Sequence, residues 1–256
     1  MKLSIITINL NNREGLKKTA KSIVNQTFTD YEWLVIDGGS TDGSVDLIRQ
    51  YISEISFWVS ETDGGIYNAM NKGIQNARGE YLLFLNSGDY LFSSTVLDEA
   101  FESIDNEDIV YGLIMKETDG KISDSLAKSE ITLLDLWHNR IPHQSSFFNS
   151  SLFNRFGLYD ETLHIVADWV FYLRAIIFGG CSVKFMPIVI SVYEGGGISS
   201  KQEAEKEIQL VKDRIPAKLY DTMIDAISKQ QICRCSFFSS IYAILYRVAL
   251  VFKGNR

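Results

Sequence analysis

Short apolar runs alternate with amphipathic stretches along the first half of the chain. The runs are rich in β-branched and aromatic residues, which predicts buried strands at 3–8, 33–36, 57–59 and 81–85. The stretches between them repeat apolar residues at helical spacing, which predicts helices at 13–26, 45–51 and 67–77. Strands that alternate with helices indicate an α/β protein with a mostly parallel sheet covered by helices.

The second half of the chain continues this pattern less regularly. Further strands are predicted at 108–114, 144–148, 183–186 and 188–192, and helices at 132–137 and from Asp168 onward. Three glycines at 195–197 predict a mobile loop, which suits either a lid over a substrate or a plain linker. Two helices follow, at 203–214 and 216–230. We therefore expect one main domain at 1–200 and a helical extension at 201–256.

Several polar side chains stand where predicted strands end. The carboxyl ends of four predicted strands carry Thr7, Asp37, Asp63 and Asp89. Asp89 also follows a turn, Asn86-Ser87-Gly88, that leads the chain out of the sheet. Because open α/β sheets bind ligands at this edge, the four residues predict a ligand site there.

The turn after the first strand excludes two kinds of phosphate site. A dinucleotide-binding fold would place Gly-x-Gly-x-x-Gly there, whereas this chain has Asn9 to Arg13 without a glycine. A Gly-x-x-x-x-Gly-Lys-Ser/Thr loop is missing from the whole sequence as well. If a diphosphate binds at the predicted edge, a metal ion must offset its charge.

The histidines give no metal-binding pattern. His138 and His164 lack a partner at a spacing typical of metal ligands. His143 lies in a loop near the predicted cleft, where a histidine bonded within the protein is a more common case than a metal ligand. A contact between His143 and a substrate stays open.

Composition and charge narrow the function classes. The chain has 256 residues, of which 46% are hydrophobic and 22% charged, so it can bury one large core. The net charge of -7 argues against a nucleic-acid partner. The three cysteines do not form a zinc pattern and fit a reducing compartment. The first strand follows Met1 closely and is too short for a signal peptide, so we expect a cytoplasmic protein.

The last thirty or so residues differ from the rest of the chain. From 226 to 256 there is no acidic residue, while five lysines and arginines occur. Apolar residues repeat at helical spacing over 236–252, a stretch too short and too interrupted for a confident membrane span. We favour a helix that lies peripherally on the anionic inner face of the cytoplasmic membrane. A helix that packs in the core or in a homodimer explains the pattern about as well.

Four segments resemble glycosyltransferase family 2, whose members have the GT-A fold. These are 33–44 (WLVIDGGSTDGS), 61–73 (ETDGGIYNAMNKG), 85–89 (LNSGD) and 167–174 (ADWVFYLR). The resemblance covers about 1–200 and is most specific at 61–73. Two positions depart from the family's metal-binding string, which carries acids where this chain has Asn86 and Gly88.

The resemblance implies a role for each matching residue. Asp168 is expected to be the general base, and Asp89 to bind Mg²⁺ or Mn²⁺. The nucleotide-sugar site is expected to include Thr7, Asp37, Asp63, Asn68, Lys72 and Ser87, with Thr7 and Asp37 next to the base. Because Gly88 has no side chain, it does not supply the ribose contact usual at that position.

The resemblance also implies an activity. It is that of an inverting, metal-dependent glycosyltransferase, which moves a sugar from a nucleotide-sugar, most simply a UDP-sugar. The acceptor would be a saccharide or a lipid-linked molecule in bacterial surface polysaccharide synthesis, such as O-antigen or capsule. Two alternatives stay open. One is a non-catalytic sugar-nucleotide-binding or scaffold protein with a depleted metal motif, and the other is a glycoside hydrolase with paired carboxylates.

Overall fold

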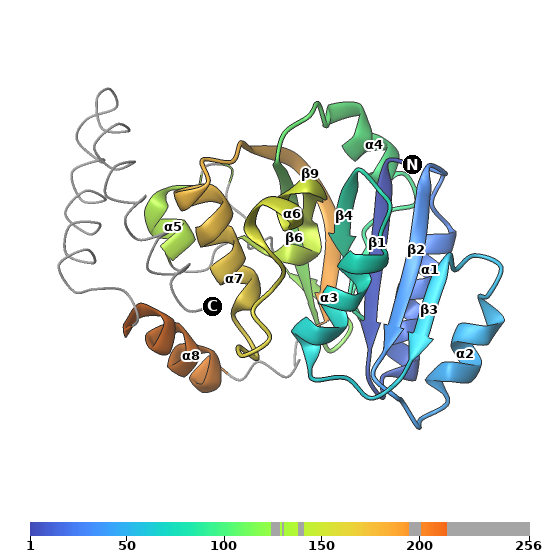
Figure 1. Ribbon diagram of the computed structural model, residues 1–256. Helices are drawn as coiled ribbons and strands as arrows, with labels where there is room; N and C mark the ends of the chain where they lie inside the picture. Colours follow the sequence, from blue (N-terminus) through green and yellow to red (C-terminus); the bar gives the residue numbers. More distant parts are fainter. Residues whose placement is uncertain (124–128, 130, 138–140, 195–200, 214–256) are drawn as a thin grey trace.

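The computed structural model describes residues 1–123, 129, 131–137, 141–194 and 201–213, which are coloured in Figure 1. The described residues form a mixed sheet of nine strands in the order β3-β2-β1-β4-β8-β6-β9-β5, with β7 paired to β6. The predicted loop at 195–197, the predicted helix at 216–230 and the apolar stripe at 236–252 lie outside the described residues.

The first half of the sheet is parallel, as the sequence predicts. Its strands are β1 (Leu3–Asn9), β2 (Tyr31–Asp37), β3 (Phe57–Ser60) and β4 (Tyr81–Phe84). The helices that connect them are α1 (Arg13–Val24), α2 (Ser44–Gln50) and α3 (Ile66–Asn76). All four strands therefore end at one edge of the sheet, which is at the bottom in Figure 1.

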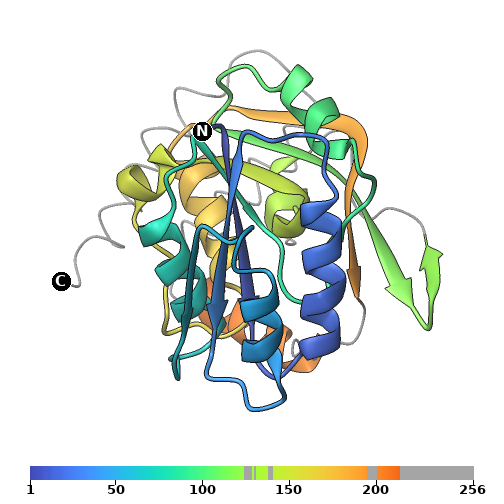
Figure 2. The same cartoon turned by 90° about the vertical axis from the view of Figure 1, so that its right-hand side faces the viewer.

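The two faces of the sheet pack against different helices because side chains alternate along a strand. Leu3 and Ile5 of β1 belong to the core cluster that includes Leu16 of α1, whereas Ile6 and Ile8 belong to the one that includes Met70 of α3. Figure 2 shows α1 and α3 on opposite sides of these strands. Burial on both faces explains why β1 reads as a continuous apolar run.

The second half of the sheet adds antiparallel pairs. Its strands are β5 (Tyr90–Leu91), β6 (Ile109–Thr118), β7 (Lys121–Ser123), β8 (Ser146–Asn149) and β9 (Val183–Glu194). β8 runs antiparallel to both β4 and β6, while β9 runs parallel to β6. Residues 143–145 form a 3-10 turn before β8, so the predicted strand at 144–148 begins later than expected.

The remaining helices are α4 (Val96–Ser103), α5 (Leu133–Trp137), α6 (Ser151–Phe156), α7 (Ala167–Tyr172) and α8 (Lys201–Asp213). α7 continues as a π-helical segment, Leu173–Phe178. α8 matches the helix predicted at 203–214. Its Val211 is buried in the same core cluster as α3, so this part of the extension packs on the main domain.

One prediction about the strands is wrong. Residues 183–186 and 188–192 are not two strands but one, β9, which pairs along β6 with two successive shifts in register. Tyr111 of β6 pairs with Phe185, but Leu113 pairs with Val189, so β9 contains two extra residues around Pro187. Proline has no N–H to donate to the ladder, and the strand bulges past it before pairing resumes.

Candidate functional site

The Asp37 side chain holds the ends of three parallel strands together. Its carboxylate is fully buried and accepts hydrogen bonds from Asn9 Nδ2 at 2.7 Å and Ser60 Oγ at 2.6 Å, at the ends of β1 and β3. Ser40 donates from its amide at 2.9 Å and from its hydroxyl at 2.6 Å. Burial would raise the pKa of Asp37, but these donors outweigh it and hold the pKa below its usual value. Asp37 is therefore an ionised group that already has its partners.

Asp63 lies directly beside this turn and is only partly buried. Its Oδ1 accepts a hydrogen bond from the amide of Gly65 at 2.9 Å. A Cβ atom at Gly38 would stand 2.8 Å from Oδ2 of Asp63, so only glycine at position 38 allows the carboxylate to lie so close. The structure thus brings Asp37 and Asp63 together, and Asp63 is the one whose carboxylate is partly exposed and can reach a ligand.

Thr7 stands further inside the sheet than the sequence predicts. β1 continues to Asn9, so Thr7 is not at the strand end, and its side chain is fully buried. Its hydroxyl oxygen accepts a hydrogen bond from Trp33 Nε1 at 3.0 Å. The apolar run ends at Ile8, but the β1–β2 ladder extends to the pair Asn9 and Asp37 because their side chains bond to each other.

The N-cap of α1, Asn12, and a residue in the middle of the helix, Thr19, fix the turn at 86–89. Thr19 donates from its hydroxyl to the carbonyl of Asp89 at 2.6 Å and accepts from the amide of Gly88 at 3.0 Å. Asn12 donates to the carbonyl of Ser87 at 3.0 Å. Gly88 has a φ of 106°, a value that side chains disfavour, so the turn depends on glycine at this position.

The Asp89 carboxyl is buried in an environment that disfavours its charge. It is 7% exposed, and its Oδ1 accepts a long hydrogen bond of 3.3 Å from the amide of Glu194. Burial raises the pKa of Asp89 to about 7, with a further contribution from the charge of Glu194, against the opposing charge of His143. A carboxylate at this position needs a nearby cation to be fully ionised at neutral pH.

The structure also places a second carboxylate here that the sequence analysis missed. A Cβ atom at Gly88 would stand 2.9 Å from Oε2 of Glu194, the last residue of β9. The carboxylate of Glu194 thus occupies space that a side chain at position 88 would enter. The only sequence signal for Glu194 is an acidic residue at the end of a predicted strand, just before the glycine-rich loop.

Asp168 lies at the start of α7 and is held by two donors. It is 8% exposed, and it accepts hydrogen bonds from the Tyr67 hydroxyl at 2.9 Å and from His143 Nδ1 at 2.8 Å. Burial alone would raise the pKa of Asp168. The hydrogen bond and charge of His143, together with the Tyr67 hydroxyl, outweigh burial and keep the pKa below its usual value.

The turn His143–Ser145 contacts both buried carboxyl groups. His143 bonds to Asp168, and the side chain of the next residue, Gln144, bonds to Asp89, so Asp89 and Asp168 lie on either side of one turn. The other ring nitrogen of His143, Nε2, is buried and has no hydrogen-bond partner within the described part of the chain. The histidine is thus bonded within the protein through one nitrogen, while the second is left for a ligand.

The three other residues expected to bind the nucleotide-sugar, Asn68, Lys72 and Ser87, make contacts within the protein. Asn68 donates to Glu161 at 2.9 Å, and the Lys72 ammonium pairs with Glu61 at 2.7 Å. Ser87 contributes backbone contacts, since its amide donates to the carbonyl of Ile8 at 3.0 Å. Asn68 and Lys72 project from the first turns of α3, on the same side of the sheet as Tyr67.

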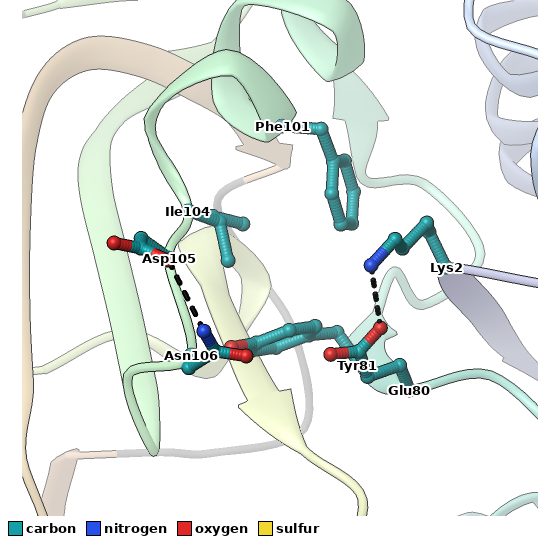
Figure 3. A pocket seen from close by; sticks show the side chains of 7 residues that line it. All are labelled: Lys2, Glu80, Tyr81, Phe101, Ile104, Asp105 and Asn106. Carbon is teal, nitrogen blue, oxygen red and sulfur yellow. Dashed lines mark hydrogen bonds and ion pairs between the residues drawn. The ribbon is translucent and has the colours of Figure 1, made fainter.

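A pocket exists elsewhere, at the opposite edge, where β1 and β4 begin (Figure 3). It is lined by an ion pair of 2.8 Å between Lys2 and Glu80 and by the rings of Tyr81 and Phe101. The carboxyl groups above all lie at the other ends of the strands. We therefore do not assign the functional site to this pocket.

The described residues contain neither a preformed group of three metal ligands nor a helix that could span a membrane. Within 1–123, 129, 131–137, 141–194 and 201–213, no group of three or more histidine, cysteine or acidic side chains is arranged to hold a metal ion by itself. In the same part of the chain, no helix is both long and apolar enough to cross a membrane.

Solved glycosyltransferase structures share this fold. TarS of S. aureus in complex with UDP-GlcNAc matches with a TM-score of 0.66 and 20% sequence identity, over 78% of this chain and 60% of that one. A mannosyltransferase of Pyrobaculum calidifontis in complex with GDP-Man and Mn²⁺ matches with a TM-score of 0.58 and 16% identity, over 75% of this chain and 56% of that one. The chain spans less than two thirds of these structures, and the shared part is the GT-A fold.

Closer relatives are found by sequence. An uncharacterised glycosyltransferase of Mycobacterium tuberculosis is 34% identical over 206 residues, which are 78% of both chains. A PGL/p-HBAD biosynthesis glycosyltransferase of Mycobacterium bovis is 32% identical over 205 residues, or 77% of this chain and 78% of the relative. The profile of the family described as "Glycosyl transferase family 2" matches residues 4–175, which include the site residues described above except Glu194. The chain belongs to glycosyltransferase family 2.

Proposed function

We propose that this protein is a metal-dependent, inverting glycosyltransferase that moves a sugar from a nucleotide-sugar to a saccharide or lipid-linked acceptor. The observation that carries the proposal is the cluster in which neighbouring residues of one turn, His143 and Gln144, bond to Asp168 and Asp89. A single displacement needs one group that helps to neutralise the charge on the departing diphosphate and one that accepts a proton from the acceptor hydroxyl. The two carboxyl groups of this cluster differ in the way that such a division requires, because one has a raised and the other a lowered pKa.

The residues around Asp89 fit a divalent cation. Asp89 itself is buried with a raised pKa, and Oδ1 of Asn86 is buried without a hydrogen-bond partner among the residues that the structure describes. Glu194 places a second carboxylate against Gly88, where the family's metal string has an acid. Mg²⁺ or Mn²⁺ held by Asp89, with Glu194 beside it, would neutralise charge that develops on the diphosphate. Phosphate oxygens and water would complete the shell, so metal affinity without nucleotide should be weak.

Asp168 is proposed as the general base. Its lowered pKa keeps it ionised at neutral pH, so it can accept the proton of an acceptor hydroxyl group. Tyr67 and His143 bond to different oxygens of Asp168, which fixes the orientation of the carboxylate. Each carboxylate oxygen has further lone pairs, so the base can still accept a proton from a hydroxyl within about 2.6–3.2 Å.

The donor side is proposed to lie along the ends of β1 to β4. Asp63, Asn68, Lys72 and Ser87 would contact the sugar diphosphate or the nucleotide. Thr7 and Asp37 would form part of the buried layer next to the nucleoside site, since their side chains are fully buried and already hydrogen-bonded within the protein. A UDP-sugar is the first donor to test, because TarS was solved with UDP-GlcNAc. A GDP-sugar is the second, because the mannosyltransferase was solved with GDP-Man.

The cellular setting of the proposal rests on the sequence alone. We propose a protein that works at the cytoplasmic face of the membrane on a surface polysaccharide such as O-antigen or capsule. Peripheral contact with anionic lipid or homodimer formation would involve 236–252, which lies outside the described residues.

A donor panel tests the proposal directly. Thermal stabilisation of the protein by UDP- and GDP-sugars, with and without Mn²⁺, identifies the donor, because a ligand that binds the native state raises its stability. Metal-dependent release of the nucleotide from that donor then shows catalysis. Asp168→Asn should abolish transfer and leave donor binding intact, and an Asp168→Asn enzyme with full activity would remove the base assignment.

The same panel decides between this function and a non-catalytic sugar-nucleotide-binding protein. That alternative is favoured by one observation, the glycine at position 88 in place of an acid. It predicts metal-dependent binding of a nucleotide-sugar without any turnover, even when acceptor sugars are supplied.

A further inference from the structure

The segment before the proposed base is held by a carboxylate from the C-terminal extension. Glu207 of α8 accepts hydrogen bonds from three consecutive backbone amides, those of His164 at 2.7 Å, Ile165 at 2.8 Å and Val166 at 3.2 Å. Hydrogen bonds to an ionised acceptor are stronger than neutral ones. Three of them to one short segment leave the backbone at 164–166 little freedom.

This segment leads directly to Asp168. Val166 immediately precedes α7, and Asp168 is the second residue of the helix. The Tyr67 hydroxyl lies 2.7 Å from the carbonyl of Ile165 and 2.9 Å from Oδ1 of Asp168, so it contacts both the segment and the base. A shift of residues 164–166 would therefore displace Asp168 through the backbone that leads into α7. It would also change the position of the Asp168 carboxylate relative to the Tyr67 hydroxyl.

α8 is itself fixed to the helices that carry the site. Val211 is 4% exposed, in the core cluster that contains Trp137 and Trp169. Lys212 places its ammonium group 5.2 Å from the centre of the Trp137 ring, which packs 6.2 Å from the ring of Trp169. Trp169 is the neighbour of Asp168 in α7. Figure 1 shows α8 below α5 and α7, to the left of the sheet and level with its lower part.

We propose that Glu207 is a positioning residue for the general base, through which the C-terminal extension completes the catalytic site. The inference rests on the proposed function, because it assumes that Asp168 accepts the proton. It goes further by assigning part of the site to a helix beyond residue 175, where the match to the family profile ends. Glu207 touches neither substrate nor metal in this proposal and acts only through the backbone at 164–166.

Kinetics with a matched pair of variants test the positioning role. Glu207→Gln removes the charge and part of the hydrogen bonding, whereas Glu205→Gln removes a charge from an exposed position of the same helix. Since a misplacement of about 1 Å can cost about 100-fold in rate, we expect Glu207→Gln to lower kcat by about 10- to 100-fold. The KM and the calorimetric affinity and stoichiometry for the donor should stay within about twofold, which shows that the protein is folded. Glu205→Gln should behave as wild type.

Hydrogen exchange provides a readout that does not depend on activity. Peptides that cover 163–172 should exchange faster in Glu207→Gln than in wild type, while peptides from β1 to β4 should be unchanged. Unchanged exchange at 163–172, or a wild-type kcat in Glu207→Gln, would overturn the inference. A loss of donor-binding stoichiometry that matches the loss of kcat would also overturn it, because the role would then be in folding alone.

These results separate the inference from the proposed function. If Asp168→Asn is inactive and Glu207→Gln has wild-type kcat, the proposed function stands and the inference fails. If Asp168→Asn retains full activity, the base assignment fails, and the inference fails with it whatever the exchange data show.

Discussion

His143 Nδ1 lies 2.8 Å from Oδ2 of Asp168, at a distance that marks a charge-assisted hydrogen bond between the ring and the carboxylate. Because Nδ1 is used in this way, the ring is oriented, and Nε2 is left buried without a hydrogen-bond partner among the described residues. His143 thus has two separable properties: a hydrogen bond that orients Asp168 and, when the ring is protonated, a positive charge that lowers the pKa of both Asp168 and Asp89.

Two substitutions of His143 should separate these properties. His143→Ala removes both and should lower kcat by about 100-fold, the lower end of what a positioned base contributes. His143→Asn keeps a donor near the position of Nδ1 but lacks the charge, so it should lose less of kcat. Steady-state kinetics with the identified donor measure both, and equal losses in the two variants would show that orientation is not the property that matters.

The buried carboxyl of Asp89 should make the stability of the metal-free protein depend on pH. Its pKa is raised to about 7, so its contribution to stability is present below the unfolded pKa of about 3.9 and is lost as the pH rises towards 7. Asp89→Asn removes this loss. The unfolding free energy of Asp89→Asn minus that of wild type should therefore increase by about 2–3 kcal/mol between pH 5 and pH 8.

Urea denaturation in the presence of a chelator measures this difference. Glu102→Gln, an exposed change on α4, is the control and should not depend on pH in this way. If the unfolding free energies of wild type and Asp89→Asn change with pH in the same way, the assignment of a raised pKa to Asp89 is contradicted.

Glu194 should contribute to cation binding. Glu194→Gln keeps the size of the side chain and its backbone hydrogen bond to Asp89 but removes the charge beside Gly88. We expect the affinity for Mn²⁺ in the presence of UDP to fall by about tenfold, a loss of about 1.4 kcal/mol. Electron paramagnetic resonance of free Mn²⁺ measures it, with Glu102→Gln as the matched control. A Glu194→Gln protein with wild-type affinity would leave Asp89 as the protein carboxylate on which the metal proposal rests.

Asp37 and Asp63 should respond differently to loss of charge, although they are neighbours. Asp37→Asn leaves several donors poorly matched in a buried site and should cost about 2–4 kcal/mol of stability. Asp63→Asn affects a partly exposed group and should change stability by less than about 1 kcal/mol while it weakens donor binding. Denaturation and calorimetry on both variants test this. A stable Asp37→Asn protein that fails to bind donor would instead indicate a direct contact between Asp37 and the nucleotide.

The packing of α3 on β1 should not tolerate a methyl group at Gly73. A Cβ there would overlap the side chain of Ile6, so Gly73→Ala should destabilise the protein by about 1–3 kcal/mol despite the better helix propensity of alanine. Gly64→Ala is the control, because its Cβ would stand 3.6 Å from the nearest atom, Cβ of Asn68. Similar denaturation midpoints for Gly73→Ala and Gly64→Ala would show that α3 can move away from the sheet.

The first half of the fold follows directly from the sequence. β1, β2 and β4 are buried on both faces and β3 is half-buried, so hydrophobic pattern alone marks them, and their parallel order follows from the helices between them. The pairing of the strands in the second half cannot be deduced from the hydrophobic pattern in this way. The antiparallel insertion of β8 between β4 and β6 is a pairing between distant segments, and Pro187 made one strand look like two.

The sequence by itself determined which residues are chemically available, because polar side chains at the ends of apolar runs stand out from the pattern. It could also place Asp37 and Asp63 at one edge, since parallel strands end together. Tertiary structure alone decided that His143 bonds to Asp168, that Glu194 fills the space beside Gly88, and that Glu207 holds 164–166. These contacts join residues on separate elements, and no local pattern encodes the distance between two side chains that meet only when the chain folds.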